Sequence, residues 1–279
     1  MNSGKIILGT VQFGCQYGIN SAGRPTVGMV RDILEAAAEN GIGTLDTSSA
    51  YGDAEQVLGE CLHGLEGRFS IVSKYPQNSG NVKDVFEGSL QRLGTDRLYG
   101  YLLHHFNVYL QDRSIWNEFQ KLRESGLIRK AGFSLYSPDE LDILLRDGID
   151  FDLIQIPRNI FDRRFDPYLP GLKERGVEIH VRSTFLQGLF FKDRDTLPEK
   201  LCPLGRYLKD LDSYSTQTGT SISELALNFN VQNPYVDKVL IGVDNREQLL
   251  ANVAALSDKR IDLDINVKEQ ELLSPVNWN

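Results

Sequence analysis

The feature that most constrains the fold of this chain is a regular alternation of short apolar runs with longer segments whose apolar residues recur at helical spacing. The runs are rich in Val, Ile, Leu, Phe and Tyr, which favour strands. We predict strands at residues 5–14, 43–48, 69–75, 98–106, 129–136, 151–157, 178–185 and 237–243. We predict helices at residues 26–40, 54–64, 81–94, 115–126, 138–148 and 223–231. The longest interruption, residues 186–220, is expected to be a functional loop.

This alternation requires a parallel sheet with right-handed crossovers, either an open doubly wound sheet or a closed barrel. Eight strand-helix units within 279 residues favour the barrel. An open sheet that binds a dinucleotide would normally carry G-x-G-x-x-G after its first strand, and the sequence has no such motif. The 10 prolines and 25 glycines are scattered, without a linker that would mark a domain boundary. We therefore predict the α/β class and a single-domain (β/α)8 TIM barrel over residues 1–279.

Charge and cysteine content argue against several classes of protein. A net charge of −8 disfavours a nucleic-acid partner, because such proteins usually concentrate Lys and Arg on one face. The apolar runs are of strand length and the start, MNSGKIILGT, lacks the order of a signal peptide, so no membrane association is expected. Cys15, Cys61 and Cys202 are odd in number and lack C-x-x-C spacing, which disfavours disulfides and a zinc site. We expect a cytoplasmic protein without a metal, monomeric or weakly oligomeric.

Polar side chains end consecutive predicted strands. Asp46, Lys74 and His104 lie at the ends of the second, third and fourth strands, and Tyr51 lies in the loop after the second. In a barrel, the loops at the carboxyl ends of the strands gather on one face and build the active site. Each residue alone has an ordinary explanation, such as an aspartate that caps a turn or a solvated lysine. Their position on neighbouring strand ends favours a shared site.

This set of side chains suits the reduction of a carbonyl group. A tyrosine phenol titrates near ~10, and the Lys74 ammonium is expected to lower the pKa of Tyr51. Asp46 would keep that ammonium charged and oriented, and His104 would hydrogen-bond the same oxygen as the phenol. Such a site would polarise a C=O group and protonate the developing alkoxide. It would still need an electron donor, and a nicotinamide supplies hydride.

Four stretches carry a resemblance to a known family. They are GIGTLDTSSAYGDAEQVLG at 41–59, IVSKY at 71–75, LQRLGTDRLYGYLLHHF at 90–106 and IGVDNREQLLANV at 241–253. Over nearly its whole length the chain resembles the aldo-keto reductase superfamily. The resemblance implies a (β/α)8 barrel with NADP(H) extended across its mouth, and NAD(H) as the alternative. It also implies a catalytic set in which the tyrosine is the general acid: Asp46, Tyr51, Lys74 and His104.

By the same resemblance, a further set of residues would hold the dinucleotide from its nicotinamide to its adenosine end. They are Thr10, Asp46, Ser134, Gln155, Arg182, Phe185, Gln187, Gly188, Gly242, Asn245, Arg246, Gln248 and Asn252. Three positions depart from the family pattern. Leu135 replaces an asparagine, Arg182 replaces the aromatic that stacks on the nicotinamide, and Asp244 stands where a small neutral residue meets the 2′-phosphate. Arg246 offsets the charge of Asp244, so NADP(H) is expected in preference to NAD(H).

The substrate is less well defined by the sequence. The expected pocket residues are Phe13, Tyr17, His105 and Phe106, of which the phenylalanines could equally pack in the core. His105, Arg158 and the polar stretch 106–114 favour a small polar carbonyl compound, such as a sugar or hydroxy aldehyde. Two other functions remain open. One is a cofactor-binding regulatory or sensor subunit with weak turnover, and the other is a barrel lyase or isomerase that binds no nicotinamide.

Overall fold

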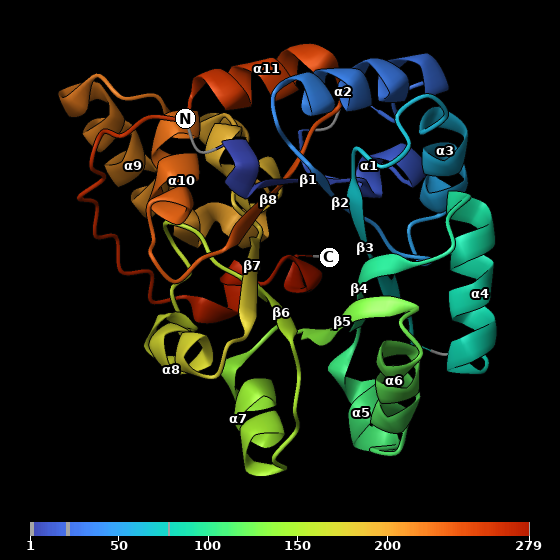
Figure 1. Ribbon diagram of the computed structural model, residues 1–279. Coiled ribbons are helices and arrows are strands. Elements are labelled where there is room, and N and C mark those ends of the chain that lie inside the picture. The colour runs from blue at the N-terminus through green and yellow to red at the C-terminus, as the bar shows by residue number, and fades with distance from the viewer. Residues whose placement is uncertain (1–2, 21–22, 78, 279) are drawn as a thin grey trace.

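In the computed structural model, which describes residues 3–20, 23–77 and 79–278, eight parallel strands close into a barrel with helices on its outside (Figure 1). The strands are β1 Ile6–Gly9, β2 Thr44–Asp46, β3 Ser70–Tyr75, β4 Leu98–Leu103, β5 Ile128–Ser134, β6 Leu153–Pro157, β7 Glu178–Arg182 and β8 Lys238–Gly242. Each strand pairs with the next along the chain, and β1 closes the sheet by pairing with β8 as well as β2. Leu8 of β1 therefore lies between Leu45 and Ile241.

Helices follow the strands and cover the outside of the barrel. They are α1 Val11–Gly14, α2 Val27–Glu39, α3 Ala54–Cys61, α4 Val82–Leu93, α5 Phe106–Gln111, α6 Ile115–Glu124, α7 Pro138–Arg146, α8 Leu169–Glu174, α9 Gly205–Thr218, α10 Ile222–Val231 and α11 Arg246–Ala254. Short 3-10 segments are η1 Ser3–Lys5, η2 Asp166–Tyr168, η3 Leu186–Phe191, η4 Arg194–Thr196, η5 Glu199–Leu204, η6 Gln270–Leu273 and η7 Pro275–Asn277. None of the helices in the described ranges is long and apolar enough to cross a membrane.

The predicted (β/α)8 barrel is confirmed, and each of the eight strands overlaps its predicted range. Three predictions of element boundaries are wrong. Val11–Gly14 form α1 rather than the end of the first strand, and Phe106–Gln111 form α5 rather than a strand end and a loop. The stretch 186–220, predicted to be a loop, contains the helix α9, whose Leu208 and Leu211 are buried. In α5 and α9 apolar residues at helical spacing pack inward, whereas in α1 Phe13 does so together with the polar Gln12.

The helix ends follow the capping preferences of their residues. α4 begins where Asn81 Oδ1 accepts a hydrogen bond from Lys83 N at 2.7 Å, and it ends at Gly94 with a φ of 64°. Asparagine satisfies a free N–H at a helix start, and glycine adopts the left-handed turn at a helix end without strain. The carboxyl ends of the strands are thus followed by helices that start at defined points.

Large apolar side chains fill the barrel below its rim. Val72, Leu102 and Leu153 are completely buried inside the barrel and pack with Tyr99. A layered apolar interior of this kind is what excludes water from a (β/α)8 barrel. This apolar layer lies below the carboxyl end of the strands, which is the end at which such barrels carry their active sites.

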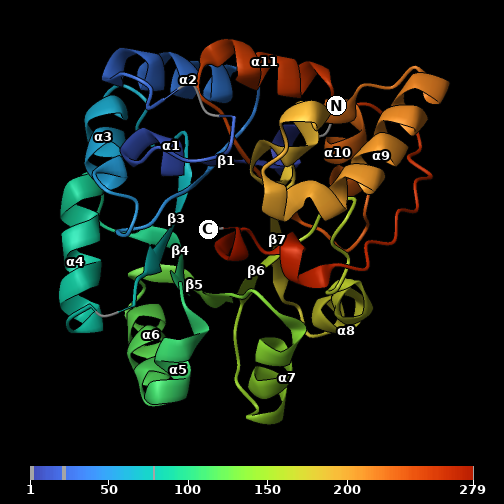
Figure 2. The ribbon, with the colours of Figure 1, turned by 180° about the vertical axis from the view of Figure 1, so that it is seen from behind.

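A second apolar cluster fixes the long connection after β7. It joins Leu186 and Phe190 of η3 to Leu208 of α9, Leu225 of α10 and Leu273 near the end of the chain. Figures 1 and 2 show α9 and α10 together on one side of the barrel, beside the red C-terminal segment. This cluster holds η3 at the rim of the barrel, where it borders the candidate site.

Candidate active site

The carboxyl rim of the barrel brings together the polar side chains that end the second, third and fourth strands. Asp46 ends β2, Lys74 lies one residue before the end of β3, and His104 directly follows β4. Tyr51 lies in the turn after β2, where its backbone N–H donates to Ser48 O at 3.0 Å. This turn places the tyrosine above the end of its own strand and beside the next one.

Asp46 and Lys74 form a buried ion pair. Lys74 Nζ lies 2.5 Å from Asp46 Oδ1, and the two side chains are 3% exposed or less. The same ammonium donates to Thr47 O at 2.9 Å and to Tyr51 Oη at 3.4 Å. The other carboxylate oxygen, Asp46 Oδ2, accepts from Gln155 Nε2 at 2.7 Å. Because both ions are desolvated and fully hydrogen-bonded, the ammonium is held in one position against the phenol.

His104 lies between the ring of Tyr51 and the hydroxyl of Ser48. The rings of His104 and Tyr51 meet edge to face, with centroids 5.6 Å apart. His104 Nδ1 lies 3.2 Å from Ser48 Oγ, which itself accepts a hydrogen bond from Ala50 N at 3.1 Å. The Ser48 hydroxyl can donate its proton to Nδ1. In the tautomer that accepts there, a neutral imidazole carries its proton on Nε2, from which it can donate to a ligand.

Burial sets the protonation state of both rings. Burial raises the pKa of Tyr51 well above its ordinary value, and Asp46 and Tyr17 raise it further. The expectation that this pKa would be lowered is wrong, because desolvation and the charge of Asp46 outweigh the lowering effect of Arg182. Burial also lowers the pKa of His104 well below its ordinary value, and the charge of Lys74 adds to the effect. At neutral pH Tyr51 is a protonated phenol and His104 is a neutral imidazole.

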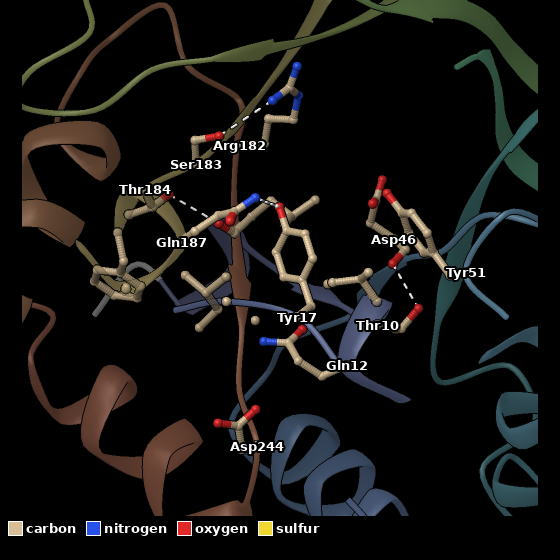
Figure 3. A pocket seen from close by; sticks show the side chains of 18 of the residues that line it. Thr10, Gln12, Tyr17, Asp46, Tyr51, Arg182, Ser183, Thr184, Gln187 and Asp244 are labelled. Carbon is tan, nitrogen blue, oxygen red and sulfur yellow. Dashed lines mark hydrogen bonds between the residues drawn. The ribbon is translucent and has the colours of Figure 1, made fainter. Parts of the chain in front are cut away.

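A cavity of about 660 Å³ opens above these side chains. Figure 3 shows Asp46 and Tyr51 together on one side of it, with Arg182 and Asp244 at opposite ends of the view and Tyr17 between them. Small-molecule sites commonly have volumes of ~300–1,000 Å³ and combine apolar walls with a few polar groups. The cavity is therefore large enough for an extended ligand that reaches the rim of several strands.

Most of the residues that the resemblance assigns to a dinucleotide line this cavity. They are Thr10, Asp46, Gln155, Arg182, Phe185, Gln187, Gly188, Gly242, Gln248 and Asn252. Three do not. Ser134 is buried and paired in register with Gln155, and Asn245 caps α11 by accepting from Gln248 N at 2.8 Å. Arg246 Nη2 lies 3.6 Å from Glu39 Oε2 on α2, outside the cavity.

Arg182 places a cation on the cavity lining, where its charge acts on Tyr51 and His105. Its guanidinium lies over the ring of Tyr136, 4.2 Å from the ring centroid, and Nη2 donates to Leu135 O at 3.0 Å. The pKa of His105 is lowered by burial and then by the charge of Arg182. The arginine is therefore held in place by an aromatic face and a backbone carbonyl, and its charge reaches the histidines of the site.

Two of the four expected pocket residues line the cavity. Tyr17 and His105 do so, whereas Phe13 and Phe106 lie in the apolar core with exposed fractions of 0% and 3%. The prediction for the phenylalanines is wrong because both belong to short helices, α1 and α5, that turn their apolar residues inward. Phe13 and Phe106 therefore do not form walls of the cavity, and the phenylalanines that line it are Phe185 and Phe191.

The two other hints of a polar ligand in the sequence have structural explanations. Arg158 is 3% exposed, pairs with Asp166 at 2.7 Å and donates to Asn230 Oδ1 at 2.8 Å. The stretch 106–114 is mostly the helix α5, in which Tyr109 is completely buried. Neither Arg158 nor any residue of the stretch 106–114 lines the cavity, so neither is an argument for a polar substrate.

The loop after β1 is joined to the loop after β7 across the cavity. Ile19 N donates to Gln187 O at 3.0 Å, and Asn20 Nδ2 donates to Gly188 O at 2.6 Å. Gln187 Nε2 donates to Tyr17 Oη at 2.9 Å. Gln187 and Gly188 both have positive φ, 52° and 88°, which turns their carbonyls toward the first loop. Tyr17 is thereby held in the middle of the cavity (Figure 3).

Sequence reasoning missed two side chains of the site, Gln12 and Ser48. Gln12 lines the cavity, and its Oε1 is buried without a hydrogen-bond partner among the described residues. Its amide lies so close to Gly242 that a Cβ there would collide with it. The sequence signal for Gln12 is a glutamine inside an apolar run, and the signal for Ser48 is a serine two residues after Asp46. Both residues lie within predicted strands, which gives them an ordinary explanation.

Comparisons with known proteins agree with this architecture. The model of the Aldo/keto reductase family matches residues 5–266. The uncharacterized oxidoreductase YqkF of Bacillus subtilis is 26% identical over 258 residues, which cover 82% of each chain. The NADH-specific methylglyoxal reductase of Escherichia coli is 24% identical over 284 residues, which cover 86% of each chain.

Two solved structures share the fold. The aldo-keto reductase AKR11C1 from Bacillus halodurans has a TM-score of 0.71 at 23% identity, with 98% of this chain and 91% of that chain covered. An aldo-keto reductase from Klebsiella pneumoniae in complex with NADPH has a TM-score of 0.69 at 24% identity, with 98% and 90% covered.

Proposed function

This chain belongs to the aldo/keto reductase family, and on that basis we propose that it reduces a small aldehyde or ketone to the corresponding alcohol with NADPH or NADH. The observation that carries the proposal is the position of the Tyr51 hydroxyl, which lies 3.4 Å from Nζ of the buried Lys74 at the rim of the barrel. A phenol beside a fixed cation can give up a proton and have the resulting phenolate stabilised.

In the proposed reaction, Tyr51 Oη and His104 Nε2 both donate hydrogen bonds to the carbonyl oxygen of the substrate. A reduced nicotinamide, when bound beside Gln155, would supply the hydride that the carbonyl carbon accepts. As negative charge develops on the oxygen, Tyr51 transfers its proton to it and becomes a phenolate. Lys74 stabilises that phenolate, and Asp46 holds the ammonium in position through the buried ion pair.

The lining of the cavity has the kinds of polar group that would bind a dinucleotide. Its wall contains donors and acceptors along its whole length, including the buried Gln12 Oε1, which has no partner within the described part of the chain. We assign Gln155 to the nicotinamide end, because it lies 2.7 Å from Asp46 Oδ2. Gln187 and Gly188 would border the phosphates, and Gln248 would border the adenosine end.

The side chains around the reacting end favour a small polar substrate. His105, Tyr17 and Tyr136 line the cavity there together with Arg182, so most of the contacts available to a substrate are polar or aromatic. The relative from Escherichia coli is named a methylglyoxal reductase. We therefore propose small oxo aldehydes and hydroxy aldehydes as the substrate class.

The proposal is tested by mixing the purified protein with NADPH or NADH and following oxidation of the dinucleotide. Methylglyoxal and glyceraldehyde should be reduced, and benzaldehyde, which has no second polar group, should be reduced more slowly. Fluorescence of the reduced dinucleotide should shift on binding without any carbonyl compound.

Two results would contradict the proposal in different ways. Absence of binding by either dinucleotide would favour a lyase or isomerase. Tight binding without turnover of any aldehyde in the panel would favour the regulatory or sensor subunit.

A further inference from the structure

The two ends of the cavity carry opposite charges. Arg182 lies close enough to Tyr51 and His105 for its charge to lower the pKa of each. Asp244 lies at the opposite end of the cavity from Arg182, beyond Gln12 (Figure 3). Over residues 3–20, 23–77 and 79–278, Arg182 is the one Lys or Arg on the lining. At the end remote from the phenol, the described lining therefore carries the carboxylate of Asp244 and no Lys or Arg.

The chemistry of the proposed function fixes which part of a dinucleotide meets Asp244. Hydride must be delivered to a carbon whose oxygen is held by Tyr51 and His104, so the nicotinamide has to lie at that end. The rest of an extended molecule then follows the cavity to the lining formed by Asp244, Gln248 and Asn252. These residues would meet the adenosine part, whose ribose carries either a 2′-hydroxyl or a 2′-phosphate.

A carboxylate discriminates between these two groups. A hydroxyl can donate a hydrogen bond to it, whereas a phosphate is anionic, brings only acceptors at neutral pH and is repelled. In other dinucleotide sites an acidic residue on the ribose accompanies NAD, and an arginine accompanies NADP. Because a carboxylate has about four acceptor positions, Asp244 can take a ribose hydroxyl and keep another hydrogen bond. Gln12 Oε1 adds a second acceptor on the same wall.

The groups that would compensate a 2′-phosphate are engaged elsewhere. Arg246 lies beside Glu39 of α2 and does not line the cavity. Asn245 Oδ1 accepts from Gln248 N at 2.8 Å, which uses one of the free N–H groups at the start of α11. Gln248 Oε1 accepts from Asp244 N at 2.8 Å, so the backbone N–H of Asp244 is also used within the protein.

We infer that this chain takes NADH in preference to NADPH, which reverses the preference that the sequence favours. The inference rests on the proposed function, because it treats the cavity as a dinucleotide site. Asp244 is the residue that sets the preference, by accepting the ribose 2′-hydroxyl and repelling a 2′-phosphate at the same position.

The test is a fluorescence titration of the full chain with NADH and with NADPH. NADH should bind at least about tenfold more tightly to the wild type. Asp244→Ser should tighten NADPH binding and weaken NADH binding, so that the ratio of the two dissociation constants moves by about tenfold or more toward NADPH. Asp262→Ser removes the same charge at an exposed position outside the cavity and should leave the ratio unchanged.

The possible failures are distinguishable. If neither dinucleotide binds, the proposed function fails together with the inference. If NADPH binds as tightly as NADH or more tightly, or if Asp244→Ser leaves the ratio unchanged while the variant still binds NADH, the inference fails and the proposed function stands. Arg246→Ala gives a further check, because a selective loss of NADPH affinity would show that this arginine reaches a 2′-phosphate and would overturn the inference.

Discussion

Lys74 Nζ lies 2.5 Å from Asp46 Oδ1 at a point in the barrel where neither side chain meets solvent. Both carboxylate oxygens of Asp46 accept hydrogen bonds, because Gln155 Nε2 donates to Oδ2. The only anion bonded to the ammonium within the described ranges is this aspartate, and its other partners are Thr47 O and Tyr51 Oη. The pair therefore couples the stability of the barrel rim to the position of the phenol.

Lys74→Met should lower both stability and turnover. Removing one partner of a buried ion pair leaves an uncompensated charge and costs about 3–5 kcal/mol of unfolding free energy. The phenolate of Tyr51 would also lose its stabilising cation, so initial rates should fall. Urea denaturation and steady-state kinetics measure the two effects separately.

Lys83→Met provides the control for this substitution. Lys83 is 67% exposed and lies 3.7 Å from Glu87, so its loss should change the unfolding free energy by no more than about 0.5 kcal/mol. Adding Asp46→Asn to Lys74→Met should recover part of the stability without restoring turnover. A Lys74→Met protein as stable and as active as the wild type would contradict the role given to the pair.

The two directions of the reaction should depend differently on pH. The raised pKa of Tyr51 keeps the phenol protonated and the lowered pKa of His104 keeps the imidazole neutral. Carbonyl reduction uses these forms, so its kcat should stay flat from about pH 7 to about pH 9. Alcohol oxidation needs the phenolate, so its rate should rise with pH over the same range. A reduction rate that halves near pH 7 would contradict these protonation states.

Glu178 should stabilise the barrel at the end remote from the site. Glu178 Oε1 lies 2.6 Å from His180 Nε2, and its Oε2 accepts from Tyr99 Oη at 2.6 Å and from Lys130 Nζ at 2.8 Å. Burial alone would raise the pKa of Glu178, but these three partners together lower it below its ordinary value. A carboxyl with a depressed folded pKa contributes stability that is present above about pH 4.5 and is lost as pH falls.

Glu178→Gln should therefore destabilise the protein by about 3 kcal/mol at neutral pH and weaken the loss of stability on acidification. Its kcat should equal that of the wild type, because Glu178 begins β7 while the proposed site lies beyond the other end of the strands. Unfolding free energies between neutral and acidic pH measure the first effect. An equal acid sensitivity in both proteins would show that this network does not carry the pH dependence.

Gly14→Ala should displace the turn that carries Tyr51. A Cβ at Gly14 would lie 1.8 Å from Tyr51 O and 2.5 Å from Ala54 N, so the backbone of the turn must move. Because misplacing a catalytic group by about 1 Å can cost about 100-fold, kcat should fall by roughly that factor. Affinity for the dinucleotide should change much less.

Gly28→Ala is the control for this substitution. Gly28 lies in α2, and the nearest atom to its Cβ would be Thr26 Oγ1 at 4.0 Å. This change should leave kcat intact and raise stability by about 0.5–1 kcal/mol. Equal kcat values for the two alanine variants would show that close packing at Gly14 is not what positions the tyrosine.

The sequence predicted the barrel because strand and helix periodicities alternate without ambiguity, and parallel strands with crossovers leave few architectures. The prediction was wrong in the stretch 186–220, where a mostly polar sequence forms the helix α9. The range 205–218 begins with glycine and is rich in Ser, Thr and Asp, so its apolar spacing at Leu208 and Leu211 was overlooked. Gly219, which follows this range and adopts the left-handed conformation, was the residue that could have indicated the end of a helix.

Positions in the candidate site were predicted better than their energetics. Strand ends and the family resemblance placed Tyr51 and Lys74 close together, but sequence does not show how deeply a group is buried. The pKa of Tyr51 was expected to fall because its cation was counted and its desolvation was not. The position of Gln12 depends on the close approach of its amide to Gly242, and the orientation of Arg246 depends on its contact with Glu39 of α2. No sequence motif indicates either contact.

The most direct test of the central claim is the rate of a single turnover by Tyr51→Phe. The variant, saturated with the dinucleotide that the wild type binds best, is mixed with methylglyoxal, and oxidation of the bound dinucleotide is followed. We expect binding within about twofold of the wild type and a rate at least about 100-fold lower, because only the proton donor has been removed. A Tyr51→Phe protein that oxidises its bound dinucleotide at the wild-type rate would contradict the assignment of Tyr51 as the acid.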